Sequence, residues 1–295
     1  MSVRPLRLRR SVLFVPGSNA KAMAKVRSLA CDALIFDLED AVAPDAKDAA
    51  REALRAYFHE NPAIRSERII RINSLSTRDG PEDLLTARAC MPDAILIPKV
   101  DVPSDVADVA DMLAEADAGE ELRLWAMIET PKAILNVAAI AERGETTGSR
   151  LDCLVVGPND LAKDLRMPGS SRTALTPMLS EVVVAARAFG LDVLDGVFNA
   201  FRDPEGLRAE CDDGARMGFD GKTLIHPGQI TVANEAFGMS DARIEEASAI
   251  VAAYDRPENV TAGAIALDGR LVERLHLEEA RRTLALAAMQ GRNEE

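Results

Sequence analysis

The feature of this sequence that most restricts its fold is a regular alternation of short apolar runs with amphipathic stretches. Several of the runs are apolar almost without interruption, which is typical of strands that are buried on both faces. Helical sequence follows each run, so the pattern predicts βα units and a parallel sheet. The eight runs span residues 12–15, 33–38, 68–72, 94–97, 122–128, 153–156, 191–194 and 219–225.

Eight such units predict a (β/α)8 TIM barrel, because an open doubly wound sheet usually has fewer strands. The length of 295 residues suits one barrel of about 250 residues with a short extension. Hydrophobic residues make up 47% of the chain and aromatic residues only 4%, which favours a core of branched aliphatic side chains. We expect a catalytic barrel at residues 1–236 and a C-terminal lid at 237–295.

Amphipathic patterns place helices outside the strands and in the lid. They predict helices at 47–58, 102–114 and 177–189, with Thr176 as the N-cap of the third and Pro177 as its first residue. In the lid, a helix is expected from Ser240-Asp241 to Tyr254 and another at 273–289. Between them, two apolar runs flank Asp268-Gly269, which predicts a tight hairpin.

Charge and composition exclude several classes of protein. The net charge of -13 argues against a nucleic-acid partner, because phosphate binding needs a basic face. No run approaches the roughly 18 apolar residues of a membrane span, so we expect a cytoplasmic protein. The four cysteines have neither zinc-site nor disulfide spacing.

One basic cluster stands out in this acidic chain, and two interpretations of it are open. Arg4, Arg7, Arg9 and Arg10 form either a solvated N-terminal arm or an anchor for an anionic cofactor tail.

Charged and polar residues recur where the predicted strands end, and barrel enzymes build their active sites there. Carboxylates that converge on one mouth repel each other unless a cation neutralises them. Glu129 and Asp160 follow neighbouring strands, so they are the predicted ligands of Mg²⁺, with Mn²⁺ as an alternative. Arg71 is expected to face a substrate carboxylate or carbonyl, and Pro158 and Asn159 are expected to border the substrate.

Other residues admit simpler explanations. Lys99 and Lys222 either form ion pairs in the mouth or bind substrate, whereas His226 is expected to cap or pack at the end of strand 8. Gly221-Lys222-Thr223 is not the end of a phosphate loop, since Arg216 occupies the position where that motif needs glycine.

The motifs at these strand ends, taken together and in order, resemble the citrate lyase β-subunit-like enzymes. That family includes malyl-CoA, citramalyl-CoA and citryl lyases and belongs to the wider HpcH/HpaI aldolase group. The resemblance extends from residue 10 to about residue 285. The matching segments are Arg10-Ser11-Val12-Leu13-Phe14-Val15-Pro16-Gly17, Asp37-Leu38-Glu39-Asp40-Ala41-Val42, Arg71-Ile72-Asn73, Pro98-Lys99, Glu129-Thr130, Gly157-Pro158-Asn159-Asp160-Leu161 and Ile225-His226-Pro227-Gly228-Gln229.

The resemblance implies a barrel with a C-terminal lid that assembles as trimers or hexamers. It implies that Glu129 and Asp160 hold Mg²⁺ and that Arg71 binds the oxygen of the keto-acid product. It also implies that Glu39 and Asp40 order water around the metal.

The lid segment departs from the family pattern at two positions. Residues 268–274 resemble a family segment whose Asp reaches into a neighbouring subunit and transfers protons, but here Glu273 replaces that Asp. Leu275 replaces a proline of the same segment. Lys21, where Arg is more usual, and Lys25 are the expected contacts for the coenzyme A tail, together with the N-terminal arginines.

The expected function is a Mg²⁺-dependent carbon–carbon lyase. It would cleave or form a 3-hydroxyacyl-CoA such as malyl-, citramalyl- or citryl-CoA, with an acyl-CoA and a 2-keto acid as the other reactants. Arg71, Glu39, Asp40 and Glu273 are the expected catalytic residues. Three alternatives are open: a CoA-independent keto-acid aldolase, a citrate lyase β chain acting on an acyl-carrier thioester, and a non-catalytic barrel that binds keto acids.

Overall fold

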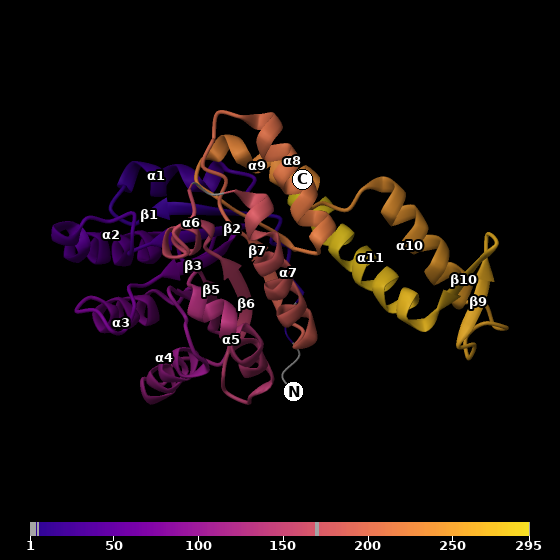
Figure 1. Ribbon diagram of the computed structural model, residues 1–295, viewed down its shortest axis with the longest axis horizontal. Coiled ribbons are helices and arrows are strands. Elements are labelled where there is room, and N and C mark those ends of the chain that lie inside the picture. The colour runs from indigo at the N-terminus through magenta and orange to yellow at the C-terminus, as the bar shows by residue number, and fades with distance from the viewer. Residues whose placement is uncertain (1–3, 5, 169–170, 295) are drawn as a thin grey trace. The chain divides into compact units, whose positions relative to one another are not determined.

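The first part of the chain forms a closed barrel of parallel strands. The computed structural model describes residues 4, 6–168 and 171–294. In these residues eight strands pair in chain order, and β8 pairs back with β1 to close the barrel (Figure 1). The strands are β1 (Ser11–Pro16), β2 (Ala33–Asp37), β3 (Glu67–Arg71), β4 (Ala94–Ile97), β5 (Arg123–Ile128), β6 (Leu151–Val156), β7 (Asp192–Asp195) and β8 (Gly221–Leu224). The predicted TIM-barrel fold is therefore confirmed.

Helices cover the outside of the barrel, as Figure 1 shows for α2, α3, α4, α5 and α7. Each parallel strand needs such a crossover to return the chain to the same end of the sheet. The helices of this part of the chain are α1 (Ala20–Lys25), α2 (Lys47–Glu60), α3 (Gly80–Cys90), α4 (Pro103–Glu115), α5 (Pro131–Glu142), α6 (Pro158–Asp164), α7 (Arg172–Ala188), α8 (Pro204–Met217) and α9 (Ile230–Ala236). Short 3-10 turns lie at η1 (Val26–Ser28), η2 (Pro44–Ala46), η3 (Arg143–Glu145) and η4 (Pro227–Gln229).

The interior of the barrel is a packed apolar core. Successive side chains of each strand point alternately into the barrel and outward against the helices. Trp125 is fully buried there, and Phe14 packs against the same cluster. The inward residues of the cluster are Val12, Ala33, Ile35, Ile69, Ala94, Leu96, Trp125, Met127, Cys153, Val155 and Leu194.

Helix α7 corrects one prediction. It begins at Arg172, so Thr176 is not an N-cap and Pro177 lies inside the helix. The hydroxyl of Thr176 donates to the carbonyl of Arg172, one turn earlier. The helix continues through the proline, with one backbone hydrogen bond lost, because Leu175 and Leu179 keep the same apolar face buried on both sides of it.

The chain divides into two compact units, the first built mainly from Arg9–Ala236 and the second mainly from Phe237–Glu295. The second unit contains α10 (Asp241–Tyr254), the antiparallel strands β9 (Ala264–Leu267) and β10 (Arg270–Glu273), and α11 (Arg274–Glu294). Ser240 caps α10 as expected. Asp268 and Gly269 both have positive φ, so the predicted Asp-Gly hairpin is confirmed.

The amino end of the barrel is closed by a buried ion-pair network centred on Arg9. Its guanidinium donates to both carboxylate oxygens of Glu67 at 2.9 and 2.8 Å, to Asp152 at 2.6 Å and to Asp192 at 2.9 Å. It also lies 4.7 Å from the centroid of the Trp125 ring. Glu67, Asp152 and Asp192 belong to β3, β6 and β7, so one side chain ties three strands together at this end.

The burial of two of the four N-terminal arginines corrects both interpretations for Arg9 and Arg10. Arg9 is only 2% exposed and Arg10 only 3%, so neither belongs to a solvated arm. Arg10 pairs with Asp32 at 2.8 Å, just before β2. Because both arginines lie at the amino end of the strands, they are also not available for an anionic ligand at the opposite, carboxyl end.

The cysteines and the hydropathy of the helices can also be compared with the sequence. Cys31, Cys90, Cys153 and Cys211 are all buried and free. Within the part of the chain that the structure describes, every helix falls short of the length or hydropathy that a membrane span requires.

Replacing Arg9 by Ala should lower the free energy of unfolding by about 3–5 kcal/mol, because the buried carboxylates of Glu67 and Asp152 lose their guanidinium. The measurement is urea unfolding followed by circular dichroism. Arg216→Ala is the matched control: this arginine is 70% exposed and should contribute less than about 1 kcal/mol. Equal unfolding midpoints for the two variants would contradict the assignment.

Candidate active site

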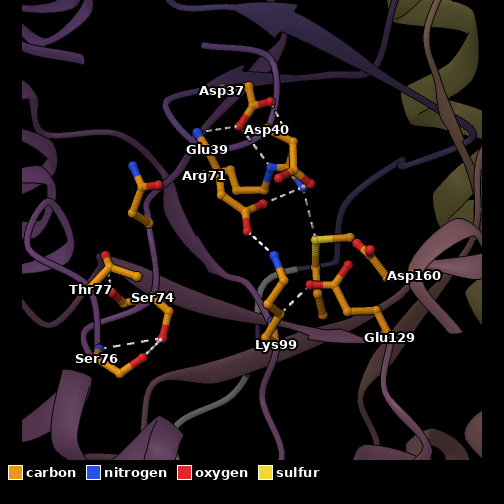
Figure 2. A network of polar contacts seen from close by, with 12 residues as sticks. Asp37, Glu39, Asp40, Arg71, Ser74, Ser76, Thr77, Lys99, Glu129 and Asp160 are labelled. Atoms are coloured by element: carbon orange, nitrogen blue, oxygen red, sulfur yellow. Dashed lines mark hydrogen bonds and ion pairs between the residues drawn. The ribbon is translucent and has the colours of Figure 1, made fainter. Parts of the chain in front are cut away.

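The carboxyl end of the barrel gathers the charged residues that the sequence places after the strands. Asp37 and Arg71 are the last residues of β2 and β3 and are register partners across the two strands. Glu39 follows β2, and Glu129 follows β5. Figure 2 shows these side chains joined in one network of polar contacts.

Arg71 is oriented by a bidentate hydrogen-bonded ion pair with Asp37. Its Nε and Nη2 donate to the two oxygens of Asp37 at 2.7 and 2.6 Å, and Nη1 lies 2.8 Å from an oxygen of Glu39. The ring of Phe14 lies below, 4.9 Å from the guanidinium carbon. Burial alone would lower the pKa of Arg71, but the charges of Asp37 and Glu39 outweigh it and raise the pKa above its ordinary value. Arg71 is therefore a permanent, oriented positive charge.

Glu39 lies between two cations. Its Oε1 forms an ion pair with the ammonium of Lys99, and its Oε2 faces Nη1 of Arg71. That Oε2 is buried and, despite this short contact, has no partner in hydrogen-bonding geometry. Burial is the main cause that raises the pKa of Glu39, and the negative charge of Asp40 adds to it.

The loop that carries Glu39 is held by a buried lysine. The ammonium of Lys47 donates to the backbone carbonyls of Leu38 and Glu39, both at 2.7 Å, and to Oδ1 of Asn73 at 3.1 Å. Asp37 accepts the backbone N–H of Glu39 at 2.9 Å. These contacts fix the loop backbone, so the position of the Glu39 carboxylate is set by the fold.

Glu129 is only 1% exposed and is positioned by backbone groups. Its Oε1 accepts the backbone N–H of Lys99 at 2.8 Å, and Lys99 adopts a left-handed conformation with φ of 50°. A non-glycine residue in this region is strained, and such strain often marks a functional site. Burial raises the pKa of Glu129 to about 7, with a further contribution from the charge of Glu39.

Asp160 follows the neighbouring strand, near the start of α6 (Figure 2). Strands β5 and β6 are paired up to Ile128 and Val156, so Glu129 and Asp160 leave adjacent strands one and four residues later. Asp160 is partly exposed, with Lys163 3.9 Å from its carboxylate.

The carboxylates of this mouth fit a divalent cation. The buried Oε2 of Glu39 has an ion-pair contact with Arg71 but no hydrogen bond. Glu129 is disfavoured as an anion by burial and by the like charge of Glu39, and a bound cation relieves both effects. Among the described residues, no three His, Cys, Asp or Glu side chains are grouped as a metal site. A cation held here by Glu129 and Asp160 thus needs oxygens from water or substrate, as Mg²⁺ commonly does.

The other expected site residues of the barrel follow the carboxyl ends of its strands. Asp40 is largely exposed, with its carboxylate 3.8 Å from Arg71. Lys21 and Lys25 are exposed on α1, which follows β1 at the carboxyl end of the barrel. Pro158 and Asn159 line a cavity of about 210 Å³ between the ends of β6 and β7 and helices α7 and α8.

The structure decides between the two interpretations of the lysines in favour of ion pairs. Lys222 is fully buried and bonds to Asp195 at 2.9 Å and to Glu210 at 2.7 Å. Lys99 pairs with Glu39. As expected, His226 acts as a cap, because its Nδ1 accepts the backbone N–H of Gly228 at 3.0 Å.

Sequence reasoning missed the positioning roles of three residues that shape the site. Asp37 orients Arg71, Lys47 holds the Glu39 loop, and the backbone of Lys99 holds Glu129. The contact between Asp37 and Arg71 could have been predicted, because the two residues end neighbouring strands. The left-handed conformation of Lys99 could not have been predicted, because a lysine does not indicate positive φ.

Replacing Gly157 by Ala should displace Glu129, because the added Cβ would lie 2.4 Å from its Cβ and 2.5 Å from its Oε2. We expect a loss of about 1–3 kcal/mol in the free energy of unfolding, measured in urea. Gly263→Ala is the control, since its Cβ would meet no atom within 4 Å. A Gly157→Ala protein as stable as this control would show that Glu129 does not pack against the backbone at this position.

Comparison with known proteins identifies the family. Residues 10–227 match the HpcH/HpaI aldolase/citrate lyase family. The chain is 47% identical over 279 residues to a (3S)-malyl-CoA thioesterase of Cereibacter sphaeroides, covering 94% of each protein. It is 33% identical to the human mitochondrial citramalyl-CoA lyase, covering 95% of this chain and 85% of that protein.

Among solved structures, the protein CitE of Mycobacterium tuberculosis in complex with magnesium, acetoacetate and coenzyme A matches with a TM-score of 0.74 and 30% identity. The match covers 94% of this chain and 97% of that one. The present chain is therefore an enzyme of the HpcH/HpaI aldolase/citrate lyase family, as its fold, its sequence and its relatives together show.

Proposed function

We propose that this enzyme is a Mg²⁺-dependent carbon–carbon lyase that cleaves a 3-hydroxyacyl-CoA, such as malyl-, citramalyl- or citryl-CoA, to an acyl-CoA and a 2-keto acid. The observation that carries the proposal is the buried network of Asp37, Glu39, Arg71 and Lys99 beside Glu129. It combines a fixed guanidinium for a developing oxygen anion with carboxylates that suit a cation.

The cofactor and substrate classes are supported by the M. tuberculosis relative, whose structure contains magnesium, acetoacetate and coenzyme A. In the present enzyme Glu129 and Asp160 would hold Mg²⁺, with Mn²⁺ as a possible substitute. When bound, the metal supplies Lewis-acid polarisation of the oxygens of the 2-keto acid. Glu39, and Asp40 beside it, would accept hydrogen bonds from water around it.

The residues of the chain account for the remaining steps. In the cleavage direction the substrate hydroxyl gives its proton to solvent water, and the electron pair of the O–H bond forms the ketone. The carbon–carbon bond breaks, and its electron pair goes to the thioester side. This gives the 2-keto acid and a thioester enolate. Arg71 donates from Nη1 to the oxygen that becomes the ketone, since its other edge is occupied by Asp37. A proton then returns to the enolate carbon, which needs a general acid.

Glu273 of the second unit is the proposed acid. It is exposed at the end of β10, and its backbone N–H donates to Nδ1 of His276 at 2.9 Å, which anchors the start of α11. As in the family segment that it resembles, we propose that the hairpin serves the site of a neighbouring copy in a homotrimer or hexamer. The coenzyme A phosphates would meet Lys21 and Lys25.

A second function has specific support, because the relative that is 47% identical is named a thioesterase. In that reaction water attacks the thioester carbonyl, the carbon–sulfur bond breaks, and a free acid and coenzyme A leave with no carbon–carbon cleavage. The names of both relatives denote CoA thioesters. They favour these two reactions over a CoA-free aldolase, an acyl-carrier thioester or a non-catalytic barrel.

The assay that tests the proposal follows both sets of products from malyl-CoA, citramalyl-CoA and citryl-CoA with Mg²⁺. A lyase releases a 2-keto acid and an acyl-CoA without free thiol, whereas a thioesterase releases free thiol and a hydroxy acid. Glu129→Gln should lower kcat/KM about 10³-fold or more, which corresponds to roughly 4 kcal/mol. Glu181→Gln, on the exposed side of α7, should leave it unchanged. Full activity in EDTA would contradict the proposal.

Replacing Glu273 by Gln should lower kcat about 10²–10⁴-fold with little change in KM, because the variant cannot donate the proton. Steady-state kinetics with the best thioester measures this. Glu279→Gln, exposed on α11, is the control. Unchanged turnover in Glu273→Gln would remove this residue from the mechanism.

A further inference from the structure

An exposed aromatic pair lies at the carboxyl end of the barrel, outside the charged network. Phe201, in the loop after β7, stacks on His226, which follows β8. Their ring centroids are 5.1 Å apart and the ring planes differ by 21°. Phe201 is 44% exposed, and it is the only Phe, Tyr or Trp that is exposed in residues 4, 6–168 and 171–294. The feature that sets Phe201 apart is its stacking on His226, which presents an aromatic surface of two rings rather than one isolated side chain.

The His226 side of the pair is rigidly built. Gln229, which is fully buried, accepts the backbone N–H groups of Ile225 and His226 at 3.0 and 3.1 Å. Its amide donates to the carbonyl of Phe198 at 3.0 Å, so one buried side chain joins the loops after β7 and β8. The bond from Gly228 to Nδ1 of His226 fixes the imidazole ring.

The Phe201 side is held as well. The side-chain amides of Asn159 and Asn199 bond reciprocally at 3.3 and 2.7 Å, which ties the Phe201 loop to the loop that carries Asp160. The backbone N–H of Phe201 donates to the carbonyl of Asn199 at 2.9 Å. The two rings thus form a preformed surface. Ligand binding therefore loses little conformational entropy in these loops.

The charges around the pair favour a flat, neutral ligand group. The guanidinium of Arg202 lies over the Phe201 ring, 5.5 Å from its centroid, so a base that stacks there also meets this cation. Asp203 and Glu205 lie one and three residues further along the chain. These mixed charges suit an aromatic base better than a phosphate. Strand β8 pairs with β1, so the loop of His226 leaves the barrel next to the loop that leads to α1 and its exposed Lys21 and Lys25.

We propose that Phe201 and His226 form a stacking platform for the adenine base of the CoA thioester. This inference rests on the proposed function for the identity of the substrate and adds where its nucleotide end binds. Stacking of a base on an aromatic side chain strengthens binding about 5–150-fold and requires no base-specific hydrogen bond. The platform therefore recognises the carrier and leaves selection of the acyl group to the charged network.

The test is calorimetric titration of the intact protein with coenzyme A and with 4′-phosphopantetheine, which lacks the nucleotide. Phe201→Ala should weaken binding of coenzyme A about 10-fold and leave binding of phosphopantetheine unchanged. Phe201→Trp, which retains an aromatic face, should bind coenzyme A like the wild type. Leu135→Ala is the control, because this side chain is 85% exposed on α5, away from the platform.

Equal weakening of both ligands by Phe201→Ala would assign the ring a structural role and overturn the proposal. So would unchanged binding of coenzyme A, or wild-type protein that binds phosphopantetheine as tightly as coenzyme A. These outcomes do not depend on turnover. A protein that shows the expected pattern but cleaves no thioester would refute the lyase proposal and leave the platform intact.

Discussion

The site depends on the buried contact between Arg71 and Asp37. These residues end neighbouring strands, so the barrel itself brings them together, and two hydrogen bonds fix the plane of the guanidinium. That orientation directs Nη1 toward Glu39, and Glu39 in turn positions the ammonium of Lys99. The backbone N–H of Lys99 holds Glu129, so these side chains form one connected network across the ends of β2 to β5.

The two ends of the barrel use buried arginines for different purposes. At the amino end Arg9 is surrounded by the carboxylates of Glu67, Asp152 and Asp192, and its donors are taken up by protein groups. At the carboxyl end the buried Oε2 of Glu39 has an ion-pair contact with Arg71 but no hydrogen bond. An incompletely satisfied polar network costs stability, and such a cost is commonly retained where a ligand completes the network.

The sequence allowed the barrel to be predicted because buried parallel strands are apolar on both faces, and all eight runs became strands. Arg71 and Glu129 were found because charged residues at strand ends share one mouth, and Glu39 was found through the resemblance to the family. Pro177 was misjudged because burial of Leu175 and Leu179 outweighs the local preference of proline for a helix start. Arg9 was misjudged because its partners are 58 to 183 residues away in sequence. The strained turn at Lys99 depends on tertiary contacts that local patterns do not encode.

The central claim is that the carboxylates of the mouth bind a divalent cation jointly with a 2-keto acid. Calorimetric titration with Mg²⁺, with and without a saturating 2-keto acid such as pyruvate or oxaloacetate, tests it most directly. Because the protein supplies few metal-binding oxygens of its own, bound keto acid should raise the affinity for Mg²⁺ about 5–150-fold. By thermodynamic linkage, bound Mg²⁺ should raise the affinity for the keto acid by the same factor. Mg²⁺ affinity that is unchanged by keto acid, or keto acid that binds equally well in EDTA, would contradict the account.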